Sequence, residues 1–207
     1  MSSPQPERTN AFADTLTEDI KSLARTNGAD LIGIASVDLF HDSPKRLHPA
    51  GILPGAKSVV VLAVKYPDAA IDQWGKPPAE SMFFYQSVQA SMTGIVMPMI
   101  QFHVYRALER AGYLAIPVAP SGYWRYRDYQ EMKGGFYADF SHRHAAVAAG
   151  LGDLGLNGLL LSPEFGVRQR MASVITTAPL RPDEPYCSKT LCTNCGRCLK
   201  ACPIQAF

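Results

Sequence analysis

The chain lacks any long apolar run. Its most apolar stretches, residues 58–64 and 95–100, fall far short of the roughly 18 to 20 residues that a membrane-spanning helix needs. The first ten residues, MSSPQPERTN, carry neither the apolar centre of a secretion signal nor a twin-arginine pair. We therefore expect no membrane partner and a cytoplasmic location.

Charge of one sign is also missing. The 207 residues contain 20 basic and 18 acidic side chains, for a net charge of +2, and no segment gathers Lys or Arg into a run. This balance gives no strong signal for nucleic acid or for an anionic membrane surface. Because 47% of the residues are hydrophobic, the chain can bury the core of one ordinary domain with a small appendage.

Cysteine is absent from residues 1–186, which argues against a disulfide framework. All five cysteines lie in the last 21 residues: Cys187, Cys192, Cys195, Cys198 and Cys202. Thiols that gather in one short segment indicate a metal site.

Hydrophobic periodicity predicts an α/β (α+β) core with helices around a sheet. Residues 1–10 are polar and are expected to form a disordered tail, and residues 11–178 form the core. The core is expected to contain helices at about 16–27, 83–111 and 141–149, strands at 31–35, 58–64, 114–118 and 171–176, and an ordered loop over a pocket at 121–137. The continuous β-branched run at 58–64 is typical of a central strand that is covered on both faces.

The long helical segment at 83–111 contains Pro98, which should kink or divide it. We expect its inward face to carry Ile95, Met99, Val104 and Leu108. After the core, three prolines stiffen a linker at 179–186, and residues 187–207 begin a ferredoxin-type domain.

The cysteines read C-x2-C-x2-C-x3-C-P from Cys192 to Pro203, the spacing of bacterial 4Fe-4S ferredoxins. Structural zinc is the alternative, but zinc sites usually pair two C-x2-C knuckles across a longer loop. In two-cluster ferredoxins the fourth cysteine of such a run binds the other cluster. Either Cys187 or Cys202 therefore completes a single cluster, or the sequence is the front part of a longer protein with a second cluster; we favour the longer protein.

Residues 150–155, GLGDLG, match the dinucleotide fingerprint G-x-G-x-x-G. That fingerprint follows a strand and opens a helix, whereas an alanine-rich helical segment precedes these glycines. We interpret them as a helix end and a tight turn with close backbone approach.

Several segments resemble one family: HRHAAVAAGLGDLGLNGLLLSPEFG at 142–166, SVITTAPL at 173–180, the cysteine motif, and ADLIGIA, LPGAKSVVVL and RAGY further upstream. Together they resemble the cobalamin-dependent epoxyqueuosine reductases and reductive dehalogenases. The resemblance implies a nitroreductase-like mixed sheet, a corrinoid held over it, and ferredoxin-type clusters that supply electrons. Where epoxyqueuosine reductases usually read Gly-Lys-Asn, this chain has Leu156 in the middle position, so the substrate stays open between a modified nucleoside and another small molecule.

The resemblance also suggests site residues. Tyr137 and Asp139 precede the helix at 141–149, where the family places a proton donor, although a carboxylate there also suits a helix cap. His144, Asn157, Gly158 and Arg170 are candidates for corrinoid contacts. The alternatives are a structural role for His144, turn shaping for Asn157 and Gly158, and a solvent-facing position for Arg170. An external carrier such as ferredoxin or flavodoxin would supply electrons. The competing interpretations are an iron–sulfur electron carrier without corrinoid and a flavin or nicotinamide oxidoreductase.

Overall fold

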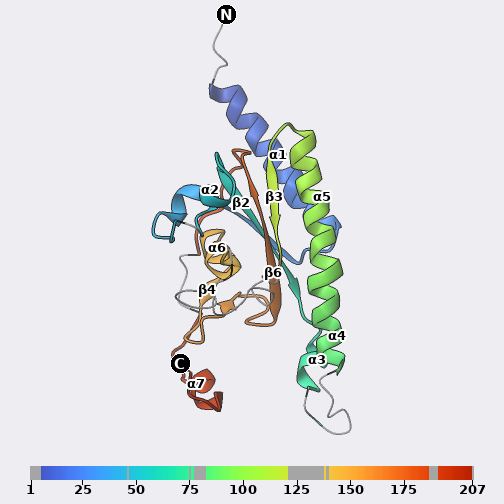
Figure 1. Cartoon of the computed structure of the whole chain (residues 1–207), viewed down its shortest axis with the longest axis vertical. Coiled ribbons are helices and arrows are strands. Elements are labelled where there is room, and N and C mark those ends of the chain that lie inside the picture. The colour runs from blue at the N-terminus through green and yellow to red at the C-terminus, as the bar shows by residue number, and fades with distance from the viewer. Residues whose placement is uncertain are drawn as a thin grey trace, which may run out of the picture.

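The computed structural model describes residues 6–45, 47–74, 76, 83–120, 138, 140–186 and 191–206 (Figure 1). In chain order the elements are α1 (Pro6–Thr26), β1 (Leu31–Ser36), η1 (Val37–Phe40), α2 (Pro49–Ile52), β2 (Ser58–Lys65), α3 (Asp68–Asp72), α4 (Phe83–Ser91), η2 (Met92–Val96), α5 (Met97–Arg110), β3 (Ala115–Val118), α6 (His142–Ala148), β4 (Asp153–Leu154), β5 (Leu160–Leu161), β6 (Gln169–Thr176) and α7 (Arg197–Ala201). Each helix and strand expected in the core has its counterpart here. No helix within the described ranges has the length and apolar character that crossing a bilayer requires.

A four-stranded sheet in the order β1-β2-β6-β3 forms the centre of the molecule. All three strand pairings are antiparallel, where a mixed sheet was expected, and Val61 of β2 lies between Gly33 of β1 and Ser173 of β6. The first six residues of β2 are buried, which confirms it as a central strand. The helix-flanked α/β sheet is confirmed, and both of its edges, β1 and β3, leave backbone groups that need other partners.

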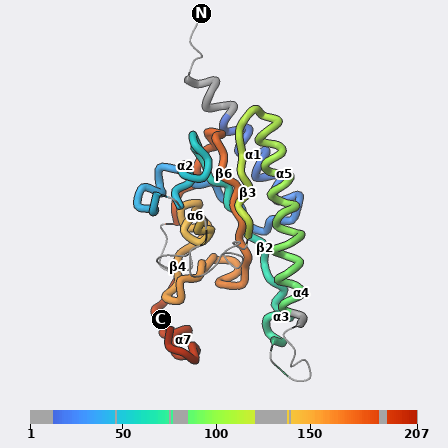
Figure 2. Tube along the Cα trace, viewed as in Figure 1, coloured from blue at the N-terminus to red at the C-terminus, as the bar shows by residue number. Residues whose placement is uncertain are grey.

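The two faces of the sheet bury separate hydrophobic clusters because alternate side chains of a strand point in opposite directions. Val60 and Leu62 pack with residues of α1 and α5. Val59 and Val61 pack on the opposite face with α6 and with η1. The Cα trace shows α1 and α5 on one side of the sheet and α6 on the other (Figure 2).

The long helical segment is divided, as Pro98 predicts. A π-helical turn, η2, separates α4 from α5, and Pro98 lies in the first turn of α5, directly after η2. Val104 and Leu108 are buried as expected, but Ile95 and Met99 are wrong as inward residues, because their exposed fractions are 62% and 51%. The inward stripe is completed instead by Met97, Ile100 and Gln101.

The N-terminal helix is longer than the sequence pattern indicates. Helix α1 begins at Pro6, so helical backbone occupies the second half of the segment expected to be a disordered tail. Residues 121–137, expected to form an ordered loop over a pocket, lie outside the described residues.

Candidate functional site

The first turn of α6 organises the candidate site. Ser141 caps the helix: its side chain accepts a hydrogen bond from the His144 N–H, and its Oγ lies 2.6 Å from His144 Nδ1. The next three side chains, His142, Arg143 and His144, diverge because neighbouring helical residues are about 100° apart. Each contacts a different part of the molecule.

His142 points into the core between β3 and β6. Its Nε2 lies 2.8 Å from the carbonyl oxygen of Ala119 and its Nδ1 lies 2.9 Å from Ser173 Oγ. Since a carbonyl can only accept, the proton is on Nε2, and Nδ1 accepts from the Ser173 hydroxyl. Burial lowers the pKa of His142 to about 4, and the nearby positive charge of Arg170 acts in the same direction. The hydrogen bond to Ala119 opposes this shift. The ring is therefore neutral at pH 7, and it serves as a structural link.

Arg170 on β6 has one N–H donor that no described residue accepts. Its Nη2 donates to the carbonyl oxygen of Pro120 at 2.9 Å, but its Nε is buried and has no partner among the described residues. Burial raises the pKa of the adjacent Tyr66, an effect that the positive charge of Arg170 opposes. A buried N–H donor without a partner is unfavourable unless a further group accepts from it.

Arg168, two residues earlier in the chain, forms ion pairs with two aspartates of α3. Its guanidinium pairs with Asp68 at 2.9 Å and with Asp72 at 2.7 Å, so it fastens β6 to α3. Of the two arginines, only Arg170 is a candidate to contact a bound group.

The glycine turn after α6 confirms the interpretation of GLGDLG as a helix end. Gly150 has φ +75°, and the N–H of Leu151 bonds to the carbonyl of Ala146, as in a Schellman-type ending. Gly152 has φ +151°, and a Cβ there would overlap the backbone carbonyl of Leu161. The turn needs glycine for reasons of backbone geometry, which accounts for the pattern without a nucleotide.

Asn157 and Gly158 lie in the hairpin that joins β4 to β5. The side-chain oxygen of Asn157 accepts from the N–H of Leu159 at 3.2 Å, and the carbonyl of Gly158 accepts from Nη1 of Arg143. These contacts hold the hairpin against α6. These interactions shape the turn, and the predicted corrinoid contact of both residues stays a prediction.

His144 lies on the wall of a cavity of about 570 Å³. Most of its lining is apolar: Leu39, Phe40, Pro44, Leu47, Phe140, Val147, Ala148, Leu154 and Pro185, with Asp42, Ser43, Ser141 and His144 as the polar members. The cavity thus has one wall from α6 and another from Pro185, which precedes the cysteine segment. A mainly apolar pocket with a few polar groups is typical of a small-molecule or cofactor site.

The structure brings only some of the predicted residues together. His144 lines the cavity, Arg170 lies beside His142 at the other side of the α6 turn, and Asn157 and Gly158 belong to the hairpin. Tyr137, Asp139 and Cys187 lie outside the described residues, so their roles stay predictions.

A buried polar bridge in the core was not predicted from the sequence. Nε2 of Gln101 on α5 donates to the backbone carbonyls of Val118 and Ser173, both at 2.8 Å. It ties α5 to β3 and β6 next to the His142 contact. The signal was a lone polar residue in the buried stripe of α5.

The four described cysteines lie in and around a short loop with left-handed backbone at Asn194 (φ 53°) and Gly196 (φ 69°), followed by α7. A hydrogen bond from the Arg197 N–H lowers the pKa of Cys195, and hydrogen bonds from the Ala206 and Ile204 N–H groups lower the pKa of Cys202. Within the described ranges, no three His, Cys, Asp or Glu side chains converge closely enough to hold a metal ion. The fit to an iron–sulfur cluster rests on thiol donors at ferredoxin spacing and on N–H groups that already point at sulfur.

Solved structures with the same fold identify the fold of the protein. The chain superposes on epoxyqueuosine reductase with a TM-score of 0.62 at 22% identity, over 93% of this chain and 53% of that one. It superposes on the catabolic reductive dehalogenase NpRdhA with a TM-score of 0.65 at 22% identity, over 91% of this chain and 25% of that one. The fold is therefore the one that these two groups of reductases share.

Sequence comparison identifies the same relatives. The chain is 27% identical to epoxyqueuosine reductase of Bacillus subtilis over 213 residues, 93% of this chain and 51% of the relative. It is 48% identical to tetrachloroethene reductive dehalogenase of Desulfitobacterium hafniense over 64 residues, 30% of this chain and 12% of the relative. Residues 188–207 match the 4Fe-4S binding domain family.

The chain is thus a relative of the epoxyqueuosine reductases and the reductive dehalogenases, and it carries a ferredoxin-type 4Fe-4S segment. It spans about half the length of the curated epoxyqueuosine reductase that it matches, and less of the dehalogenase.

Proposed function

We propose that this chain is part of a cytoplasmic, corrinoid-dependent reductase that receives electrons through a 4Fe-4S cluster. Its relatives are named as reductases of two kinds, and its C-terminal segment matches a 4Fe-4S binding domain. The substrate is a small organic molecule or a modified nucleoside. An external carrier of the ferredoxin or flavodoxin class supplies the electrons.

The observation that carries this proposal is the position of the cavity. Its wall joins the predicted cofactor residue His144 to Pro185, and Cys192 follows Pro185 by only seven positions. A group bound there would lie between the sheet core and the cluster segment. That arrangement suits single-electron transfer from one centre to the other.

The residues fit a corrinoid on two grounds. The cavity lining is largely apolar. Nε of Arg170 lies outside that lining and has no partner among the described residues, so it can donate to a carboxamide or phosphate oxygen of a group that extends beyond the cavity. A corrinoid would supply a cobalt centre that accepts electrons one at a time. In this proposal His144 contacts the group at the cavity, Asn157 and Gly158 approach it from the hairpin, and Tyr137 or Asp139 donates a proton.

Cofactor analysis of the full-length protein tests the proposal. After anaerobic purification and reconstitution with iron, sulfide and cobalamin, we expect bound cobalt and a corrinoid absorption spectrum. His144→Ala should weaken cobalamin binding roughly tenfold, the effect of losing one good polar contact. The matched control His41→Ala removes an exposed histidine outside the cavity lining and should bind cobalamin normally. Reconstituted protein that binds no cobalamin, or that carries flavin instead, would contradict the proposal.

A further inference from the structure

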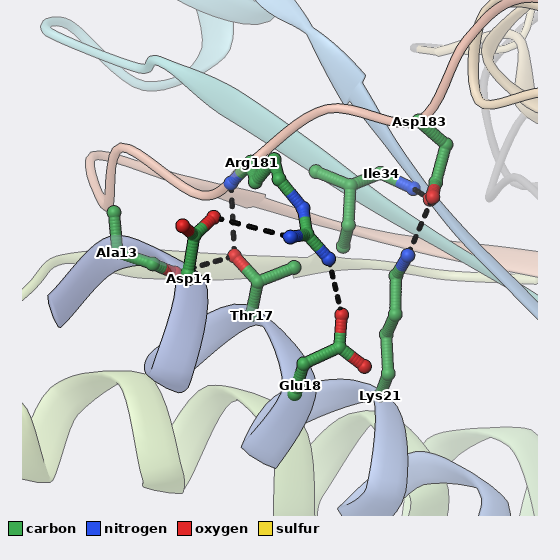
Figure 3. Close-up of polar contacts among 8 residues, drawn as sticks. All are labelled: Ala13, Asp14, Thr17, Glu18, Lys21, Ile34, Arg181 and Asp183. Atoms are coloured by element: carbon green, nitrogen blue, oxygen red, sulfur yellow. Dashed lines mark hydrogen bonds and ion pairs between the residues drawn. The ribbon is translucent and has the colours of Figure 1, made fainter. Parts of the chain in front are cut away.

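A polar face of α1 holds the segment that leads into the cysteines (Figure 3). Thr17 Oγ1 donates to the carbonyl of Ala13 at 2.6 Å and accepts the backbone N–H of Arg181 at 2.8 Å. The Arg181 guanidinium pairs with Asp14 at 3.3 Å and with Glu18 at 2.5 Å. Since these α1 residues are three or four positions apart, they share one face of the helix.

Asp183 forms the least exposed of these ion pairs, with Lys21. Its carboxylate accepts from Nζ of Lys21 at 2.5 Å and from the backbone N–H of Ile34 at 2.8 Å, and its own N–H donates to the Ile34 carbonyl at 2.8 Å. The Lys21 side chain is only 10% exposed. Ile34 belongs to the edge strand β1, so Asp183 satisfies backbone groups that would otherwise lack a strand partner.

The same segment is confined from its other side by the glycine turn. A Cβ on Gly150 would overlap the carbonyl oxygen of Glu184, which shows how closely the two backbones approach. The next residue, Pro185, forms part of the cavity wall. Residues 181–185 therefore run between α1 and the α6 turn immediately before the cluster segment. We call residues 181–185 the strap.

We propose that Lys21 and Asp183 are positioning residues that lock the strap to the core and so set the distance between the cluster and a cofactor in the cavity. This rests on the proposed function. In the step concerned, the reduced cluster loses one electron and the cofactor gains one. No bond forms or breaks, and an external low-potential carrier then re-reduces the cluster. Tunnelling slows steeply with distance, so a loosened strap slows this step without altering either centre.

The burial of Lys21 favours this role over that of a surface ion pair: its side chain is 10% exposed, and that of Asp183 is 34% exposed. Fully exposed pairs contribute little and exchange readily with water. Removing Lys21 leaves the partly buried Asp183 carboxylate without its cation, and the segment that carries it must move to hydrate it fully. Loss of Lys21 therefore loosens the strap in particular.

Three variants of the full-length protein test the proposal. Lys21→Met removes the cation, and Asp183→Asn keeps an acceptor for Ile34 while removing the charge. Lys65→Met is the matched control, because Lys65 pairs with Asp68 at 2.6 Å and, among the described residues, forms no ion pair with the strap. For each variant we measure amide exchange of residues 181–186, the rate of iron extraction by a chelator, and the rate of electron transfer from the reduced cluster to bound cobalamin.

In Lys21→Met we expect strap exchange and iron extraction to accelerate roughly tenfold or more, with exchange in α5 unchanged. Asp183→Asn should shift both in the same direction by less, and Lys65→Met should match the wild type. Electron transfer should slow in the first two variants while iron content at purification stays constant. Unchanged strap exchange in both variants overturns the proposal, as does faster exchange with unaltered electron transfer. Failure of the wild type to bind cobalamin refutes the proposed function instead. Amide exchange and iron extraction then still test whether Lys21 and Asp183 hold the strap in place.

Discussion

At the scale of single residues, the core around the site is held by side chains with defined protonation. His142 joins α6 to β6 and to the segment after β3 through Ser173 and Ala119. The Ser173 contact requires a neutral ring because Nδ1 accepts in it, whereas Nε2 donates to Ala119 in either protonation state. A protonated ring could not accept from the Ser173 hydroxyl. The fold around α6 is therefore sensitive to acid.

The pKa of about 4 for His142 gives a direction for that sensitivity. Between pH 6.5 and about 4, His142 is protonated in the unfolded chain but not in the folded chain. The free energy of unfolding therefore has its full value above pH 6.5 and decreases as the pH falls to about 4. The loss amounts to at most about 3 kcal/mol. Urea unfolding at a series of pH values measures it.

The variant His142→Gln keeps a donor and an acceptor but does not titrate, so its stability should fall less over the same pH range. His41→Gln removes an exposed histidine and should retain the wild-type slope. A wild-type slope in His142→Gln would show that another group causes the acid sensitivity.

Gly112 and Gly152 allow the free-energy cost of a positive φ to be measured apart from the cost of a steric clash with a Cβ atom. Gly152 combines positive φ with backbone that a Cβ would overlap, whereas Gly112, at φ +88°, has open space around the Cβ position. Gly112→Ala should cost about 1 kcal/mol for its conformation alone. Gly152→Ala should cost clearly more, about 3 kcal/mol or beyond, since the β5 backbone must shift as well. Equal losses in thermal or urea unfolding would contradict the close approach.

At the scale of elements, the division of the α4–η2–α5 segment decides which apolar side chains are buried. The sequence offers two apolar stripes on α5, and either can serve as the inward face. Ile100 is fully buried, while its neighbour Met99 is 51% exposed. Pro98 predicted the break, but which stripe faces the sheet depends on the π turn before α5, and single-sequence periodicity cannot locate such a turn.

Adjacent truncations on α5 check this assignment. Ile100→Ala should cost about 2 to 5 kcal/mol because it opens a cavity between α5 and the sheet. Met99→Ala should change the free energy of unfolding by about 0.5 kcal/mol or less. If chemical denaturation showed Met99→Ala to be more destabilising than Ile100→Ala, the assignment of the inward face of α5 would be wrong.

Other elements were predictable because a local pattern alone determines them. The β-branched run of β2 and the Ser141 cap of α6 are examples of this kind. The antiparallel pairing of all four strands was not predictable, because pairing depends on contacts between distant segments. For the site, the cysteine motif was recognisable from the sequence, and the cofactor role of His144 stays a prediction. The Gln101 bridge and the ion pair of Lys21 with Asp183 were not predictable, because they join residues far apart in the chain.

At the scale of the whole molecule, the protein joins a sheet core to a cysteine segment by a strap that is held in place. The cavity lies between α6 and the strap, with His144 on one wall and Pro185 on another. In the proposed function, a cluster in the segment that follows the strap would deliver electrons to a cofactor in this cavity. The solved structures of epoxyqueuosine reductase and of the reductive dehalogenase NpRdhA combine the same fold with longer chains.

The central claim is that thiolates of the C-terminal segment hold a 4Fe-4S cluster, and its most direct test is metal and sulfide analysis of the full-length protein prepared without oxygen. We expect iron and acid-labile sulfide in equal amounts, about four of each per cluster, with a reducible paramagnetic signal. Cys195→Ser should lower both, and comparison of Cys187→Ser with Cys202→Ser identifies the remaining ligand of this cluster. Zinc in place of iron, or iron without sulfide, would contradict the account.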